Sequence, residues 1–105
     1  MTKVLYEPKV FHIRIEGHAG SAPKGEDLVC AGVSSLGFAL LLAAGEEDYN
    51  AEIVTDADSG IIDVLCRPSG LWGRDHCTVM MDTIAGGLEL LAGQYPEYVS
   101  YEEVP

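Results

Sequence analysis

A histidine and a cysteine in the first third of the chain have the residue types of a thiol nucleophile and its base. His18 and Cys30 are too far apart in sequence to meet within one helix or strand. A strand end, a glycine-bearing loop and a helix start could bring them together. A thiolate needs a positive environment and a nearby base. We therefore take this stretch as a candidate Cys–His site.

The helix that would carry Cys30 is predicted from about Asp27 to Ala44, because Val29 begins a series of apolar residues at helical spacing. Backbone N–H groups in a first helical turn have no partner inside the helix, and that end of the helix is positive. These groups could stabilise a Cys30 thiolate or donate to a developing oxyanion. His18 could then take the thiol proton and later protonate a leaving amine.

Several neighbours of the pair are candidate supporting residues. Asp27, one helical turn before Cys30, could cap the helix or orient His18, and the sequence favours neither role. Ser34 shares a helix face with Cys30 and could line a pocket. The loop between His18 and the helix is either a flap over the site or a plain connection. Its glycine positions are Gly17, Gly20 and Gly25.

The other histidine and cysteine positions offer weaker chemistry. Neighbours on a helix point about 100 degrees apart, so His76 and Cys77 make a poor dyad by themselves. The three cysteines and the histidines lack metal-ligand spacing, so we expect neither a metal nor a cofactor. Cys66 alternates with Ile62 and Val64 and is predicted to be a core residue. Residues 71–73 have no role that the sequence assigns.

The remaining elements predict one α+β domain over residues 1–105. The order is ββαββαβ, which implies a mainly antiparallel sheet with both helices packed on one face, an α/β sandwich. His12 falls on the polar face of its strand and is expected to be solvated. Besides the first helix, the expected elements are strands at Lys3–Tyr6, Lys9–Glu16, Ala51–Thr55, Ile61–Arg67 and Tyr98–Val104, and a helix at Leu71–Ala92.

Composition limits the partners and the compartment. The 105 residues include 6 Lys and Arg against 17 Asp and Glu, a net charge of −11. This charge argues against a nucleic-acid surface and suits a basic partner. The first residues do not form a signal peptide, and the longest apolar run, within 36–44, is too short to span a bilayer. Three cysteines without framework spacing favour a reduced, cytoplasmic protein.

Two segments resemble the ribosomal-processing cysteine protease family, Prp. The more specific match comprises Gly17-His18-Ala19-Gly20, Gly25-Glu26-Asp27-Leu28-Val29-Cys30-Ala31 and Val33-Ser34-Ser35-Leu36. A weaker match comprises Gly87-Leu88-Glu89 and Gln94-Tyr95-Pro96-Glu97-Tyr98-Val99. The element order agrees as well, so the resemblance spans nearly the whole chain.

The resemblance implies a cysteine endopeptidase with Cys30 as nucleophile and His18 as base. It implies removal of a short N-terminal extension from a basic substrate, the precursor of large-subunit ribosomal protein number twenty-seven. It also implies a small α/β sandwich that forms a homodimer, with the loop between the dyad residues acting as a flap.

Two other functions are compatible with the same residues. One is a non-catalytic module that keeps the fold and only docks a ribosomal or other basic partner. The other is a thiol switch that pairs Cys30 with a second cysteine, for which the sequence suggests no partner.

Overall fold

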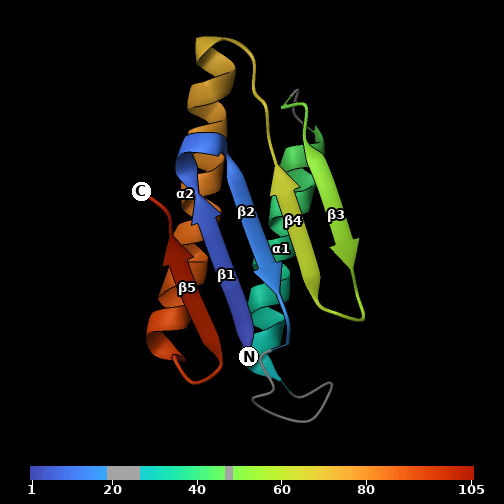
Figure 1. Ribbon diagram of the computed structural model, residues 1–105, viewed down its shortest axis with the longest axis vertical. Coiled ribbons are helices and arrows are strands. Elements are labelled where there is room, and N and C mark those ends of the chain that lie inside the picture. The colour runs from blue at the N-terminus through green and yellow to red at the C-terminus, as the bar shows by residue number, and fades with distance from the viewer. Residues whose placement is uncertain (19–26, 47–48) are drawn as a thin grey trace.

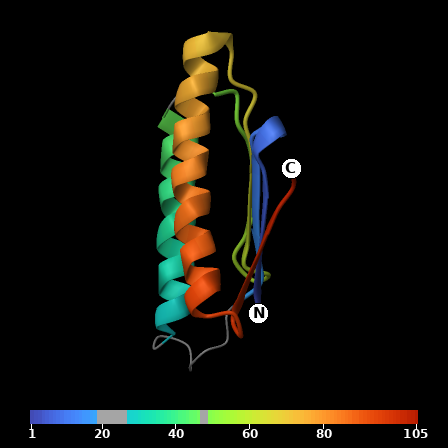
Figure 2. The same cartoon turned by 90° about the vertical axis from the view of Figure 1, so that its left-hand side faces the viewer.

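The computed structural model describes residues 1–18, 27–46 and 49–105. Five strands form one sheet in the order β3-β4-β2-β1-β5, and only β5 runs parallel to its neighbour, β1. Both helices lie on one side of this sheet, as Figure 2 shows. The predicted α+β layering and element order are therefore confirmed. The strands are β1 (Thr2–Glu7), β2 (His12–Glu16), β3 (Glu52–Asp56), β4 (Ile61–Leu65) and β5 (Val99–Glu103), and the helices are α1 (Leu28–Glu46) and α2 (Gly70–Gln94).

The core fills the space between the sheet and the helices. Ile13 of β2 lies opposite Val64 of β4, and both side chains are fully buried because alternate residues of each strand face the helices. Leu40 of α1 and Met81 and Leu88 of α2 are fully buried in the same core. Burial of one such side chain contributes about 1.5–3 kcal/mol to the stability of the fold.

Gly37 of α1 faces the sheet at close range. A Cβ atom there would lie 2.6 Å from Cδ1 of Ile62, the flexible end of a β4 side chain, so a larger residue would require that side chain to shift. The glycine that weakens the helix as a local element thus lies at the contact with β4.

The apolar run within 36–44 belongs to a longer apolar helix. By length and composition alone Leu28–Gly45 could cross a membrane, with a mean hydropathy of 2.1, a test that the core helix of a soluble protein also passes. The serines and glycines of α1 do not offset its aliphatic residues. In this fold the inner side of α1 is part of the core, where Val29, Val33 and Leu40 are buried.

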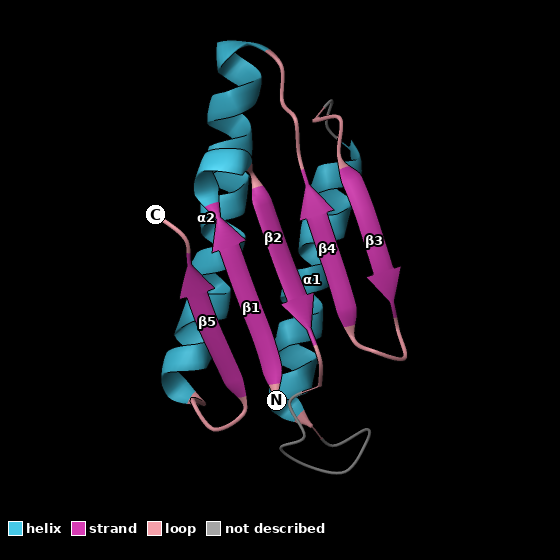
Figure 3. Cartoon of the chain, viewed as in Figure 1, coloured by secondary structure: helices cyan, strands magenta, loops and turns pink. Residues whose placement is uncertain are grey.

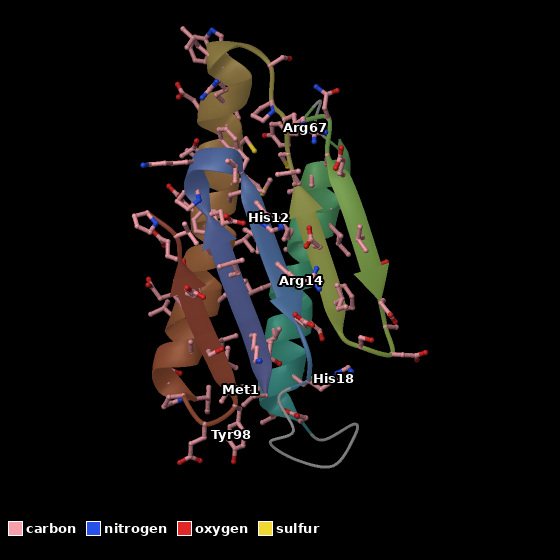
Figure 4. All side chains as sticks on the ribbon, in the orientation of Figure 1. Met1, His12, Arg14, His18, Arg67 and Tyr98 are labelled. Carbon is pink, nitrogen blue, oxygen red and sulfur yellow. The ribbon has the colours of Figure 1, made fainter. Side chains whose placement is uncertain are left out.

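Three local predictions need correction. The expected strand at Lys9–Glu16 begins only at His12, because Pro8–Val10 form a 3-10 turn and Phe11 has a φ of 55°. Helix α2 continues through Gly93 to Gln94. His12 is not solvated: its ring nitrogens lie 2.6 Å from Glu7 Oε1 and 3.0 Å from Asp63 Oδ1. His12 thus pairs with acidic residues of both neighbouring strands, β1 and β4, and its side chain is 17% exposed (Figure 4 labels its position).

One long-range hydrogen bond joins the sheet to α2. The hydroxyl of Tyr6, whose side chain is buried, donates to Asp82 Oδ1 at 2.6 Å. Burial, followed by this hydrogen bond and the carboxylate charge, raises the pKa of Tyr6. The phenol therefore stays protonated in the folded chain at a pH where an unfolded tyrosine ionises.

We expect Tyr6→Phe to lower the free energy of unfolding by about 1–3 kcal/mol at neutral pH, since a hydrogen bond to a charged acceptor is lost. The raised pKa also makes the wild-type protein lose stability as pH rises above about 10, where only the unfolded phenol releases its proton. Tyr6→Phe should lose part of this alkaline decline. Urea unfolding at several pH values measures both effects.

Tyr95→Phe, at an exposed position after α2, is the matched control. An equal alkaline decline in wild type and Tyr6→Phe would contradict the assignment.

Candidate active site

His18 lies just beyond the end of β2, at the lower end of the sheet in Figure 4. Gly17, the residue between them, has a φ of 94°, which side-chain-bearing residues rarely adopt. A Cβ atom at Gly17 would also lie 2.5 Å from the carbonyl oxygen of Met1. Only glycine therefore allows the chain to leave β2 in this direction and carry His18 to its position.

The turn between β3 and β4 holds His18 through main-chain groups. The Gly17 N–H donates to Ser59 O at 3.1 Å, and Nε2 of His18 lies 3.2 Å from Asp58 O. A carbonyl oxygen only accepts, so Nε2 must carry the hydrogen of this bond. In the neutral imidazole, Nδ1 is then the nitrogen that can accept a proton.

The same turn packs closely against the end of β2 at Gly60, which has no side chain. Gly60 has a φ of 65°, and a Cβ atom there would lie 2.5 Å from Gly17 O and 3.0 Å from Cε1 of His18. Asp56 organises the turn, because its Oδ1 accepts from the N–H groups of Asp58 at 3.0 Å and Ser59 at 3.4 Å. The carbonyl of Asp58 thereby faces the imidazole.

Cys30 occupies the first turn of α1. Asp27 Oδ1 accepts from the Cys30 N–H at 2.8 Å, which is the geometry of a helix N-cap. Of the two roles left open for Asp27, capping is the one that this bond shows, while the ring of His18 bonds to Asp58 O. The capping bond also uses the Cys30 amide, so Leu28 and Val29 supply the other first-turn N–H groups.

His18 and Cys30 line one cavity of about 360 Å³. Its walls come from α1 between Cys30 and Leu41, the end of β2 and the β3–β4 hairpin, together with Thr2 of β1. Ser34 and Phe38 contribute from α1, and Thr55 and Asp56 contribute from β3. The cavity combines an apolar wall with a thiol and an imidazole, which suits a peptide side chain held beside a nucleophile.

In the described part of the chain no hydrogen bond joins the Cys30 thiol to the His18 ring. Catalytic hydrogen bonds often tighten only when substrate is bound. The shared cavity is therefore the geometric link between the two residues. Gly20 and Gly25, and with them most of the predicted flap, lie outside the described residues.

The two remaining cysteines lie in the core. Cys66 and Cys77 are 1% and 0% exposed. Burial raises the pKa of Cys66, and burial together with Cys66 raises the pKa of Cys77 to about 12. Both are neutral, packed thiols, as the sequence predicted for Cys66. Within residues 1–18, 27–46 and 49–105 no group of side chains could hold a metal ion.

Comparison with known proteins assigns the family. The family model described as cysteine protease Prp matches residues 1–100. The chain belongs to this family. It is a cysteine protease of the Prp family, as the resemblance of the two segments implied. Among the curated proteins, none matches the chain.

Solved structures share this Prp fold along the entire chain. The essential ribosomal processing protease Prp from S. aureus, in complex with a covalently linked product peptide, has a TM-score of 0.82 at 20% identity, covering 99% of this chain and 100% of that one. SMU.848 from Streptococcus mutans has a TM-score of 0.72 at 23% identity, covering 98% and 91%. The S. aureus protease with a substrate peptide also has a TM-score of 0.72, at 19% identity, covering 98% and 97%.

Sequence reasoning missed the β3–β4 turn as part of this site. It identified residues 56–60 only as a hairpin connection. The group that contacts His18 is the Asp58 carbonyl, and every residue has a carbonyl, so residue type carried no signal. The glycine at position 60 was the single available indication.

The burial of the three thiols predicts selective alkylation. Native protein treated with iodoacetamide at pH 8 should take up one label, at Cys30, because the other two thiols are buried and stay protonated. Unfolded protein should take up a label at each cysteine. Peptide mass spectrometry measures both, and Cys30→Ser protein is the control that should remain unlabelled while folded. Labelling of native Cys77 at the rate of the unfolded chain would contradict this prediction.

Proposed function

We propose that this Prp-family protease is an endopeptidase that removes the N-terminal extension of the precursor of large-subunit ribosomal protein number twenty-seven. Cys30 is the nucleophile and His18 is its base. The observation that carries the proposal is the cavity that these two side chains share at the start of α1. The S. aureus relative, described as an essential ribosomal processing protease, supports the substrate class.

The contacts of the site suggest a sequence of steps. Nδ1 of His18 accepts the thiol proton, and the Cys30 sulfur attacks the scissile carbonyl carbon. We assign the first-turn amides of Leu28 and Val29 as donors for the resulting oxyanion, because Asp27 already occupies the Cys30 amide. The imidazolium gives its proton to the leaving amine, which departs as the thioester forms. Water then attacks the thioester, His18 takes the proton of that water, and the protonated Cys30 thiol is released.

The Asp58 carbonyl has a defined place in these steps. It accepts from Nε2 of His18 and therefore keeps Nδ1 available as the base. Its partial negative charge also stabilises the imidazolium that forms in each half of the reaction. A main-chain carbonyl thus has the orienting role that a carboxylate has in a Ser-His-Asp triad.

The charge of the chain supports a basic substrate and not nucleic acid or a membrane. The net charge is −11, which attracts the Lys- and Arg-rich tails of ribosomal proteins. Three free thiols suit a reducing compartment, so we place the activity in the cytoplasm, where such a precursor is made.

A homodimer is the proposed assembly. Helix α1 exposes Leu28, Phe38 and Leu42, at 85%, 65% and 62%, along a side that carries no charged residue before Glu46. Two copies with a net charge of −11 each repel one another, so an uncharged helix face is the surface on which they can meet. Burial of these side chains in the dimer also explains why α1 is apolar on its outer side.

Substitution on that face should dissociate the dimer. We expect Leu42→Glu to shift the protein from dimer to monomer at micromolar concentration. In a two-fold symmetric contact each copy contributes the substituted residue, so two carboxylates would be buried there. Sedimentation equilibrium measures the mass. Val10→Glu, at an exposed apolar position on the β1–β2 turn, is the control and should leave the mass unchanged. A monomeric wild-type protein would refute the proposed assembly.

Removal of either dyad residue should abolish processing. We expect Cys30→Ala, Cys30→Ser and His18→Ala each to lower kcat/KM on the precursor by more than about 1,000-fold with the fold intact, since each removes the nucleophile or its base. Mass spectrometry of the precursor measures the cleavage. The control His76→Ala changes an exposed histidine on α2 and should cleave normally.

Processing by Cys30→Ala at the normal rate would overturn the assignment of the nucleophile. A wild-type protein that binds the precursor without cutting it would instead be a docking module with the Prp fold.

A further inference from the structure

Strand β3 forms a free edge of the sheet. It is the first strand in the order β3-β4-β2-β1-β5, and Figures 1 and 3 show it at the right-hand side with β4 as its neighbour. All five of its residues are exposed, including the β-branched Ile53, Val54 and Thr55. An edge strand of this composition is a template for another strand unless the protein blunts it.

The hydrogen bonds of β4 show which main-chain groups of β3 point outward. The Cys66 N–H donates to Phe11 O on the β2 side, and the Arg67 N–H donates to Tyr49 O on the opposite side. Successive residues of a strand direct their main-chain N–H and C=O groups to alternate sides, so those of Asp63 and Leu65 bond to β3. Their partners in the antiparallel register are Val54 and Glu52.

Ile53 and Thr55, which lie between these bonded positions, therefore direct their N–H and C=O groups away from the sheet. They are the donors and acceptors that a further strand would use.

This free edge leads into the candidate active site. Thr55 and Asp56, at the C-terminal end of β3, line the cavity that also contains Cys30 and His18. A strand rises about 3.3 Å per residue, so a peptide paired with Ile53 and Thr55 would reach the cavity within a few residues. A protease must hold several residues of its substrate in an extended form, and this edge offers main-chain hydrogen bonds that can hold them.

The other edge of the sheet does not have these properties. Strand β5 pairs with β1, and none of the residues Val99–Glu103 lines the cavity, although Glu102 and Glu103 make that edge acidic as well. Access to the cavity, and not charge, therefore distinguishes the two edges. At the cavity end of β3, Asp56 and Asp58 are exposed, whereas Glu52 at its other end pairs with Arg67. A peptide with basic residues would be attracted to this hairpin.

We propose that the free edge of β3 binds the substrate main chain. An extended, basic peptide adds to the sheet as a further strand, bonds to the outward main-chain groups of Ile53 and Thr55, and places its scissile bond in the cavity. This inference rests on the proposed function for the identity of the peptide. It assigns a substrate-binding role to a strand that contains none of the catalytic residues.

Amide exchange tests the pattern directly. The probe is a synthetic peptide spanning the extension and the first mature residues of the ribosomal protein precursor, bound to Cys30→Ala protein so that it is not cut. NMR-detected hydrogen exchange should slow at the amides of Ile53 and Thr55 when peptide is added. The amides of Val54 and Asp56, which already bond to β4, should change little.

A substitution gives an independent measurement. Ile53→Pro removes an outward N–H without removing a bond to β4, and proline is tolerated at such edge positions. We expect the Kd of the peptide to rise roughly 3- to 10-fold, the effect of one hydrogen bond. Ile53→Ala is the matched control, because it removes the side chain and keeps the N–H. Fluorescence anisotropy measures binding, and circular dichroism checks the fold.

The outcomes separate the two proposals. Peptide binding and cleavage with no slowing at Ile53 and Thr55 would overturn the edge proposal and leave the proposed function intact. Slowing of these amides without peptide, increasing with protein concentration, would mean that a second copy occupies the edge and would also overturn it. A wild-type protein that neither binds nor cuts the peptide would overturn the proposed function and the edge proposal together.

Discussion

The contact between the β3–β4 turn and the end of β2 is the constraint on which the site depends. Two glycines with positive φ, Gly17 and Gly60, allow two backbones to approach more closely than side chains permit. Hydrogen bonds from Gly17 and His18 to main-chain oxygens of the turn then fix the contact. His18, although exposed, thereby acquires a defined orientation and a defined tautomer.

The start of α1 positions the second residue of the proposed dyad. Asp27 caps the helix through the Cys30 amide, which fixes where the first turn begins and therefore where the thiol lies. The capping carboxylate of Asp27 and the positive end of the α1 dipole thus lie beside the residue that we propose as the nucleophile.

The surface of the molecule divides according to charge. A net charge of −11 is spread over the strands, turns and α2, while α1 contains no charged residue before Glu46. The sheet covers the inner side of α1, and its outer side remains apolar. The same division places acidic residues along the β3–β4 hairpin beside the cavity. These are the two surfaces that we propose for a second copy of the chain and for a basic peptide.

Local patterns in the sequence were sufficient for the elements and their layering. Alternation at Ile13 and Ile15 and helical spacing from Val29 onward each reflect burial of one face, so the order ββαββαβ and the two helices on one face followed from the sequence. The family could also be recognised, because residues such as Gly17, His18, Asp27 and Cys30 lie in two short continuous segments. The start of β2 was misplaced, since the φ of Phe11 depends on a turn that its residue type does not indicate.

Only the tertiary structure shows the cavity and the part of its lining that the β3–β4 hairpin contributes. His18 and Cys30 meet the β3–β4 hairpin through pairing of β2 with β4, a contact between residues far apart in the chain. The group that orients His18 is a carbonyl, and the groups that β3 offers at its edge are amides and carbonyls. Every residue carries such groups, so the sequence cannot distinguish them. Their roles follow from where the folded backbone places them, which is why the elements were predictable and the full site was not.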